Sequence, residues 1–178
     1  MEEINIKGKL FQKLISSKEI EEIVKSLSQR INKDYTQKEI VFLIVLNGAF
    51  MFASDLLKLI EGNHKLSFIK LSSYCGVSSN NEIKELIGLN EDLRDNNIII
   101  IEDIIDSGNT MDCLIEKVKA YNPATLEICT LVFKPKAFKK RFNIKYIGRE
   151  ISNEFIVGYG FDLDGYGRNI KEIYQLKE

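Results

Sequence analysis

Short apolar runs alternate with amphipathic stretches along most of this chain. Apolar runs of this length predict buried strands, whereas apolar residues that recur every three or four positions predict helices. The pattern predicts helices over residues 19–30, 50–60 and 110–120, the first with Ser17 near its N-cap. It also predicts strands over residues 40–46, 66–72, 98–101 and 126–133, and a short strand near 146–150.

Strands that alternate with helices predict an α/β fold, with a mostly parallel sheet covered by helices on both faces. No internal repeat, low-complexity tract or linker divides the sequence, so we expect one domain over residues 1–178. In such sheets, ligands bind beyond the carboxyl ends of the strands. The candidates for function are therefore the polar residues that follow the strands: Asn47 and Gly48, Ser73 and Tyr74, residues 102–110, and Lys134.

The composition indicates which binding partners and which cellular compartment to expect. With 25 basic and 26 acidic residues the net charge is −1, and no basic block stands out, so nucleic acid is not an expected partner. The longest apolar run, residues 40–46, is too short to cross a bilayer, and the N-terminus lacks the apolar region of a signal peptide. Three distant cysteines without a C-x-x-C pair favour a reducing compartment. We therefore expect a cytoplasmic protein without a membrane span.

A single histidine restricts the possible chemistry. His64 follows Gly62 and Asn63 in a polar turn, where we expect an exposed loop residue rather than a catalytic one. In an enzyme with this composition, carboxylates, lysines and arginines must carry the reaction.

The densest chemical signal is IIIIEDIIDSGNT, residues 98–110, an apolar strand followed by acids and a small hydroxyl-rich turn. The turn places backbone N–H groups at a helix N-terminus, where a phosphate monoester binds well; its residues are Ser107, Gly108, Asn109 and Thr110. Glu102 and Asp103 can accept hydrogen bonds from a ribose diol, directly or across a divalent cation. Acids beside a phosphate repel it unless a metal offsets their charge, so Mg²⁺ is the expected cofactor. Asp106 stands apart from the pair and is available for proton transfer.

These physical arguments leave more than one interpretation open. An acidic loop after a buried strand is also typical of receiver domains and of other α/β proteins that handle phosphate. Read alone, Asn47 and Gly48 are typical of an ordinary turn. In the same way, Lys134 could belong to a solvated basic face together with Lys136, Lys139 and Lys140.

The sequence resembles the type I phosphoribosyltransferases, in particular the hypoxanthine-guanine phosphoribosyltransferases. The stretch IIIIEDIIDSGNTM is similar to their signature for 5-phosphoribosyl 1-pyrophosphate. The resemblance continues in the same order through most of the chain, in LNGAFMFASDL (46–56), LSSYCG (71–76), LVFKP (131–135) and FIVGYGFDLDGYGRN (155–169). It implies the fold of that family, in which the terminal segments form a small hood, and a receiver domain does not share the turn or the last motif.

The resemblance implies a role for each part of the signature. Glu102 and Asp103 would hold the ribose hydroxyls and a Mg²⁺, and residues 107–110 would wrap the 5-phosphate. Asp106 would be the general acid/base for the proton on purine N7. Asn109 stands where some members carry lysine.

For the pyrophosphate, the resemblance implies binding by backbone groups of Asn47 and Gly48, around a non-proline cis peptide at Leu46–Asn47. Arg168 would add a guanidinium, and Asp162 would help hold a second Mg²⁺. Many members carry lysine or arginine at the position of Asn47, so only the backbone part of this role transfers.

For the base, the resemblance implies that Lys134 reads the exocyclic oxygen at purine position six. Phe155 would stack on the ring, and backbone groups of Ile156 and Asp162 would contact its edge. For Phe155 and Ile156, core packing is the alternative interpretation. Ser73 and Tyr74 match the pair that leads a mobile loop, which would close over the site.

The predicted function is therefore a cytoplasmic, Mg²⁺-dependent purine salvage transferase. It would join hypoxanthine and guanine to 5-phosphoribosyl 1-pyrophosphate and give IMP or GMP; the sequence does not rank the two bases. The alternatives are a transferase for xanthine or a pyrimidine, and a non-catalytic, nucleotide-sensing regulator on the same fold. Members of the family are commonly dimers or tetramers, so the resemblance implies a homo-oligomer.

Overall fold

The computed structural model describes residues 2–71, 85–87 and 91–177, and its centre is a six-stranded sheet. The strand order is β5-β4-β3-β6-β7-β8. The strands are β3 (Ile40–Leu46), β4 (Lys65–Leu71), β5 (Glu85–Ile87), β6 (Asn97–Ile105), β7 (Thr125–Phe133) and β8 (Tyr146–Glu150). All neighbours pair in parallel except β5, which is antiparallel to β4 at the edge. This arrangement confirms the predicted mostly parallel sheet.

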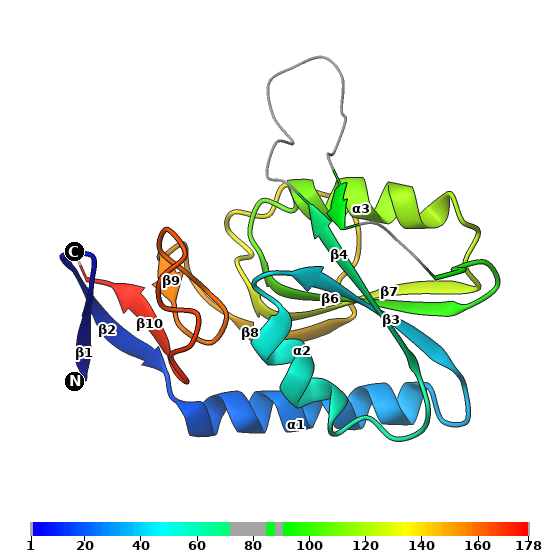
Figure 1. Cartoon of the computed structure of the whole chain (residues 1–178), viewed down its shortest axis with the longest axis horizontal. Helices are drawn as coiled ribbons and strands as arrows, with labels where there is room; N and C mark the ends of the chain where they lie inside the picture. Colours follow the sequence, from blue (N-terminus) through cyan, green and yellow to red (C-terminus); the bar gives the residue numbers. More distant parts are fainter. Residues whose placement is uncertain (1, 72–84, 88–90, 178) are drawn as a thin grey trace, which may run out of the picture.

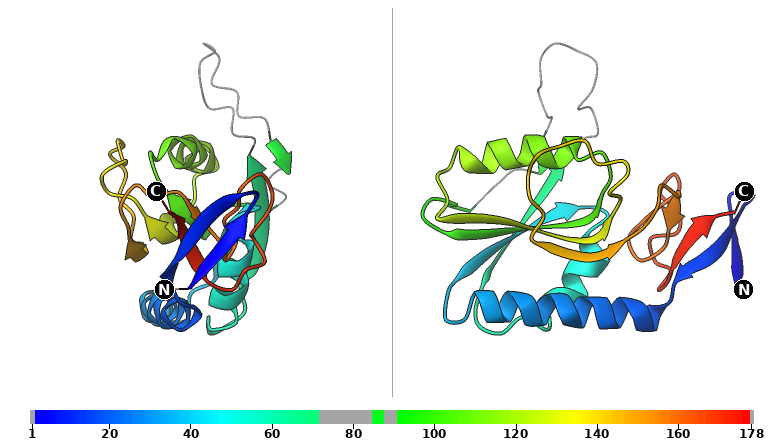
Figure 2. Two further views of the ribbon diagram at one scale, coloured as in Figure 1. Left: turned by 90° about the vertical axis from the view of Figure 1, so that its left-hand side faces the viewer. Right: turned by 180° about the vertical axis from the view of Figure 1, so that it is seen from behind.

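Helices cover both faces of this sheet, as predicted (Figure 1). α1 (Ser17–Asp34) and α2 (Phe50–Leu57) lie on one face, and α3 (Asn109–Lys119) lies on the other (Figure 2). The apolar run of β3 serves both faces, because successive side chains of a strand point to opposite sides. Phe42 and Ile44 belong to the core beneath α1 and α2, whereas Val41 and Leu43 belong to the core beneath α3.

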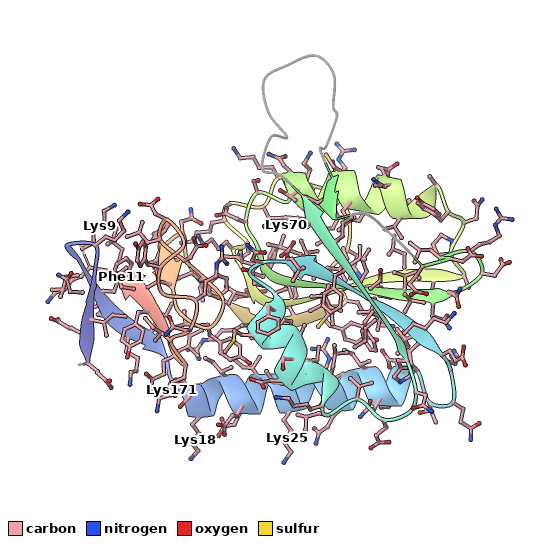
Figure 3. All side chains as sticks on the ribbon, viewed as in Figure 1. Lys9, Phe11, Lys18, Lys25, Lys70 and Lys171 are labelled. Atoms are coloured by element: carbon pink, nitrogen blue, oxygen red, sulfur yellow. The ribbon has the colours of Figure 1, made fainter. Side chains whose placement is uncertain are left out.

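α1 begins with a capping box, and its first residue is Ser17, two residues before the predicted start at residue 19. Ser16 rather than Ser17 is the N-cap: its hydroxyl accepts a hydrogen bond from the backbone N–H of Glu19, and the Glu19 carboxylate accepts one from the N–H of Ser16. Figure 3 shows Lys18 and Lys25 pointing away from the sheet on the outer side of this helix. None of the helices formed by residues 2–71, 85–87 and 91–177 is long and apolar enough to span a membrane.

Three predicted boundaries were wrong by three residues or more. α1 continues to Asp34 instead of ending at residue 30. α2 ends at Leu57 instead of residue 60, because the chain continues in tight turns in which Leu59 N–H donates to Leu56 O. β6 continues to Ile105 instead of ending at residue 101, because Ile105 pairs with Phe133 of β7. Glu102 and Asp103 therefore lie inside a strand and not in the loop after it.

The terminal segments form a second, antiparallel sheet, which confirms the predicted hood. Its strands are β1 (Glu3–Ile6), β2 (Lys9–Ile15), β9 (Ile156–Val157) and β10 (Ile173–Leu176), in the order β1-β2-β10-β9. We call this sheet, with the connection over residues 158–172, the hood. Phe11, Val157 and Tyr174 are buried in its interior, and both chain ends lie in it (Figure 1).

Candidate active site

Four segments meet at the carboxyl edge of the parallel sheet, where function was expected. They are the β3–α2 connection, the β6–α3 connection, the residue after β7, and the part of the hood between β9 and β10. The hood reaches this edge directly: a Cβ added to Gly160 would lie 2.1 Å from the carbonyl oxygen of Gly48. The segments therefore form one site, although they are distant in sequence.

The acidic pair of β6 is poorly solvated. Glu102 is 8% exposed, and its carboxylate accepts a hydrogen bond from the N–H of Asp103 at 3.2 Å. Asp103 in turn accepts one from the N–H of Ile104 at 2.9 Å. Burial raises the pKa of both carboxyls, and repulsion from Asp103 raises the pKa of Glu102 further. Bringing a cation to the pair would stabilise the charged forms of both acids.

These two carboxylates suit a Mg²⁺ ion that takes its other ligands from water and substrate better than an ion held by protein side chains alone. Mg²⁺ binds through one or two carboxylates and completes its shell with water and phosphate oxygens. Within the described part of the chain, no group of three histidine, cysteine, aspartate or glutamate side chains is arranged to hold a metal ion. Glu102 and Asp103 therefore fit a cation whose remaining ligands come from an oxygen-rich substrate.

The turn after β6 has the geometry of an anion site. Gly108 is the N-cap of α3 with φ of 82°, a left-handed conformation that glycine adopts without strain. Ser107 Oγ accepts a hydrogen bond from Asn109 N at 3.5 Å, and Asn109 and Thr110 are exposed. The first N–H groups of a helix have no intrahelical acceptor, so this turn presents backbone donors and the positive end of a dipole to an anion.

Lys134 and Asp106 form an ion pair at the centre of this edge. Lys134 Nζ lies 3.2 Å from Asp106 Oδ2, and the lysine side chain is 9% exposed whereas that of Asp106 is 53% exposed. The backbone N–H of Lys134 also donates to Ile105 O at 3.0 Å. A solvated basic face is therefore wrong for Lys134, because the turn after β7 directs its ammonium inward.

Backbone contacts assemble the predicted pyrophosphate residues. The peptide bond between Leu46 and Asn47 is cis, at the position that the family resemblance implied. A Cβ on Gly48 would lie 1.7 Å from Asp103 Oδ2, so only glycine lets this loop approach the acidic pair. Gly160, which the sequence analysis did not single out, packs on the Gly48 carbonyl. The glycine-rich tail was the signal that could have identified it.

Arg168 joins the hood to this group. Its guanidinium donates to Gly160 O and forms an ion pair with Asp162, whose other oxygen accepts a hydrogen bond from Gly165 N at 2.6 Å. The positive charge of Arg168 also lowers the pKa of Asp103, although burial outweighs it. A guanidinium therefore lies within electrostatic range of the acidic pair.

Of the remaining predicted residues, the structure describes two, Phe155 and Ile156. Phe155 is 45% exposed, and its ring centroid lies 6.4 Å from that of Phe11 in the hood. Core packing is therefore not its main role, whereas the Ile156 side chain is buried in β9. Ser73 and Tyr74 lie outside the described residues.

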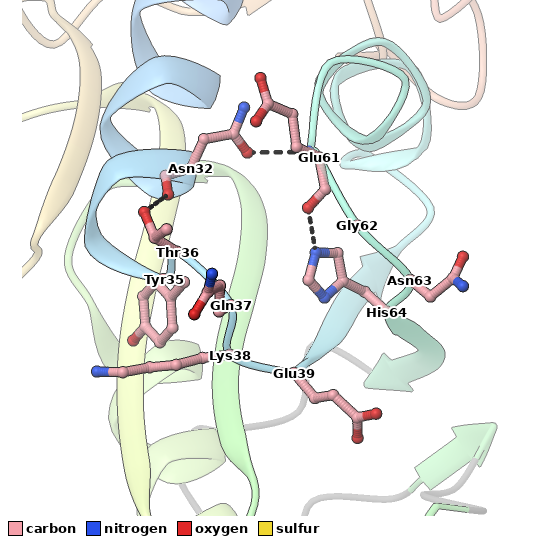
Figure 4. A pocket seen from close by; sticks show the side chains of 10 residues that line it. All are labelled: Asn32, Tyr35, Thr36, Gln37, Lys38, Glu39, Glu61, Gly62, Asn63 and His64. Atoms are coloured by element: carbon pink, nitrogen blue, oxygen red, sulfur yellow. Dashed lines mark hydrogen bonds between the residues drawn. The ribbon is translucent and has the colours of Figure 1, made fainter.

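His64 lies far from this site and has a structural role. Its Nδ1 accepts a hydrogen bond from the N–H of Ile40, the first residue of β3, so Nε2 carries the hydrogen and donates to Glu61 O at 2.8 Å. Its ring also packs edge-on against Phe42, so this loop histidine is partly buried and not exposed as predicted. Figure 4 shows the cavity beside it, which is about 490 Å³ in volume and is lined by Glu39 and His64 among others. These two residues immediately precede β3 and β4, so the cavity lies at the amino edge of the sheet.

Comparison with known proteins agrees with this geometry. Residues 13–164 match the family described as phosphoribosyl transferase domain. The chain belongs to this family. The matched region thus includes every predicted site residue except Arg168.

Relatives with assigned activities are similar over most of this phosphoribosyl transferase. A hypoxanthine phosphoribosyltransferase of Buchnera aphidicola is 39% identical over 84% of this chain and 86% of the relative. A hypoxanthine-guanine phosphoribosyltransferase of Staphylococcus aureus is 36% identical over 92% of each chain. The solved structure of a Bacillus anthracis hypoxanthine-guanine phosphoribosyltransferase superimposes with a TM-score of 0.86 at 37% identity, covering 93% of this chain and 96% of that one.

Proposed function

We propose that this phosphoribosyl transferase joins hypoxanthine, and also guanine, to 5-phosphoribosyl 1-pyrophosphate in purine salvage, releasing pyrophosphate. The observation that carries the proposal is the pairing of buried Lys134 with Asp106 beside a phosphate-binding turn. The activities of the Buchnera and Staphylococcus relatives support the same reaction.

The phosphoribosyl group would occupy the β6–α3 connection. Residues 107–110 offer N–H groups and hydroxyls to the 5-phosphate, at the positive end of α3. Glu102 and Asp103 accept hydrogen bonds from the ribose hydroxyls. The left-handed conformation of Gly108 lets the chain turn sharply between Ser107 and Asn109, so backbone N–H groups would make most of the contacts to the phosphate.

Lys134 gives the site its preference for the base. A lysine ammonium only donates hydrogen bonds, so it recognises the oxygen of a 6-oxopurine and rejects the amino group of adenine. Its burial strengthens this selection, because a buried ammonium without an acceptor is costly. The exposed Phe155 ring would stack on the purine, and backbone groups at Ile156 and Asp162 would contact its edge.

Proton transfer falls to Asp106. The bond between C1′ of the ribose and N9 of the purine forms while the bond from C1′ to pyrophosphate breaks, through an oxocarbenium-like centre. Asp106 takes the proton from N7 as this happens. When the base occupies the site, Lys134 turns from Asp106 to the purine oxygen, which leaves the carboxylate available to the proton.

Pyrophosphate departure depends on groups that meet its charge. Backbone N–H groups at Asn47 and Gly48 and the guanidinium of Arg168 would bind it. Glu102 and Asp103 would hold one Mg²⁺ and Asp162 would help hold a second, and these ions would neutralise charge on the leaving group.

The test is nucleotide formation from 5-phosphoribosyl 1-pyrophosphate and Mg²⁺ with hypoxanthine, guanine, xanthine and adenine in parallel, each with and without chelator. We expect metal-dependent product from hypoxanthine and guanine and none from adenine. Product from xanthine alone, or only from a pyrimidine assayed in the same way, would assign the enzyme to another base. No product from any of these purines or from the pyrimidine would assign a nucleotide-sensing regulator instead.

Compartment and assembly belong to the same proposal. The enzyme would act in the cytoplasm as a homodimer or homotetramer. The oligomeric state of a Trypanosoma cruzi hypoxanthine phosphoribosyltransferase has been studied together with its solved structure. That structure superimposes with a TM-score of 0.87 at 28% identity, covering 93% of this chain and 91% of that one. Sedimentation equilibrium of the purified chain would test the assembly, and a monomer at micromolar concentration would contradict it.

A further inference from the structure

The first turn of α3 carries an acid where the phosphate is expected to bind. Asp112 lies one turn after Gly108, and its N–H donates to Gly108 O at 2.9 Å. A carboxylate at this place normally stabilises a helix through the positive end of the dipole. A phosphate dianion uses the same positive end, so an uncompensated Asp112 would repel it.

Lys140 compensates this acid. Its Nζ lies 2.8 Å from Asp112 Oδ2, and the lysine side chain is 29% exposed. The stem of the lysine runs along the phosphate turn, since a Cβ on Gly108 would lie 3.0 Å from Lys140 Cγ. The ammonium therefore reaches Asp112 from across the turn, and not from within α3.

The segment over residues 134–142 fixes the position of this lysine. Its backbone is attached to the phosphate turn, because Lys139 N–H donates to Ser107 O at 3.3 Å. Its centre is packed, because the ring of Phe138 lies edge-on to Phe133 and to Phe142, with centroid distances of 5.3 and 5.1 Å. The same segment starts at Lys134, so it connects the residue that reads the base to the turn that holds the phosphate.

We propose that Lys140 is a positioning residue for the 5-phosphate of the substrate. Its ammonium neutralises Asp112, so that the N-terminus of α3 meets the phosphate without an opposing carboxylate, and its stem supports Gly108. This inference rests on the proposed function, because it concerns the same phosphate turn. It adds a side chain outside the signature at 98–111 to the binding of phosphoribosyl pyrophosphate.

The test compares Lys140→Met with Lys139→Met in steady-state transfer to hypoxanthine. Lys139 is the matched control, because it is exposed and its replacement removes the same charge from the same segment. We expect Lys140→Met to raise the KM for 5-phosphoribosyl 1-pyrophosphate about tenfold and to leave kcat within about threefold, because a fixed charge beside the dianion is lost. Lys139→Met should change this KM by less than about twofold, since solvent screens an exposed charge.

A second substitution separates charge from packing. Asp112→Asn in the Lys140→Met background removes the uncompensated carboxylate, so the KM should return to within about threefold of the wild-type value. Lys140→Arg should keep a near-normal KM, because it keeps the charge. An unchanged KM in Lys140→Met, or a raised KM that Asp112→Asn does not restore, would overturn the proposal. Melting temperatures of all variants identify any loss of folding.

Binding of ribose 5-phosphate, measured by calorimetry, keeps this proposal separate from the proposed function. Weaker binding by Lys140→Met, restored by Asp112→Asn, would support the role of Lys140 even if no base were converted. Normal turnover with equal affinity in wild type and Lys140→Met would refute Lys140 and leave the transferase standing. Failure of the wild-type protein to bind ribose 5-phosphate at all would overturn the role of Lys140.

Discussion

Asp106 combines two environments at one side chain. It is half exposed toward the site, yet one oxygen is held by the ammonium of the buried Lys134. A carboxylate in this position can lose its contact with the Lys134 ammonium and accept a proton from a substrate while the buried core stays unchanged. The role that we propose for Asp106 thus depends on where β6 and β7 end.

Replacing Asp106 with asparagine should cut turnover by ~10²–10⁴-fold, the usual contribution of a general acid/base. Binding of 5-phosphoribosyl 1-pyrophosphate should be largely unchanged, because the turn over residues 107–110 is untouched. Single-turnover kinetics with hypoxanthine separates the two effects, and wild-type turnover in the variant would exclude the assigned role.

Lys134→Gln tests the discrimination between bases. A glutamine amide both donates and accepts hydrogen bonds, so it no longer excludes an amino group at position six. The kcat/KM for hypoxanthine should fall by roughly 10²-fold, and the preference for hypoxanthine over adenine should shrink by at least about tenfold. Lys136→Gln, at an exposed lysine of the same segment, is the control. An unchanged preference would assign base selection to another group.

At the scale of elements, the capping box of α1 links stability to pH. The N–H of Ser16 and the guanidinium of Arg149, whose Nη1 lies 2.8 Å from Glu19 Oε1, lower the pKa of Glu19 to about 2. A carboxyl with a lowered pKa stabilises the folded state above its ordinary value near 4.5, and this contribution is lost as the pH falls toward 2.

Glu19→Gln should therefore lower the free energy of unfolding by about 0.5–1 kcal/mol at pH 7. The difference from wild type should decline between pH 4.5 and 2, the range between the two pKa values. Urea unfolding across this range measures it, with the exposed Glu22→Gln of the same helix as control. A difference that persists at pH 2 would show that packing, not charge, carries the effect.

Elements that are determined by the local sequence were predicted well, whereas elements that depend on pairing with distant strands were not. β3, β7 and β8 matched the prediction to within one residue. β3 is an unbroken apolar run and β7 is mostly apolar, and both end at polar or turn residues. β6 was underestimated because its last residues pair with β7, and register is a property of two strands. The hood strands are short and pair across the two chain ends, so no local pattern could place them.

The candidate site was also predictable only in part. Motifs placed its residues in order, and strand ends explained why they should gather at one edge. The partners were not predictable: Lys134 with Asp106, Gly48 with Gly160, and Lys140 with Asp112 are contacts between distant segments. A sequence specifies such contacts only through the completed fold.

At the scale of the whole molecule, the hood and the main sheet share one hydrophobic core. Ile15, Ile156 and Ile173 of the hood belong to the same buried cluster as Ile99 and Ile101 of β6. The hydroxyl of Tyr159 in the hood also donates to Asp55 of α2 at 2.8 Å. These contacts support our proposal that residues 1–178 are a single domain.

One cooperative unfolding transition should follow from this shared core. Urea unfolding monitored by far-UV circular dichroism and by tyrosine fluorescence should give coincident curves. Tyr159→Phe should lower the free energy of unfolding by about 0.5–1.5 kcal/mol, the contribution of one hydrogen bond, and both curves should move together to lower urea concentration. A separate early transition in the variant or the wild type would show that the hood unfolds on its own.

The contact between Gly48 and Gly160 limits how this protein can vary. In most packed pairs, a larger residue on one side can be accommodated by a smaller one on the other. Here neither partner has a side chain to give up, and Gly48 is also confined by Asp103. A substitution at either glycine therefore has no compensating substitution at the other, and variation at this contact requires a different path of the backbone.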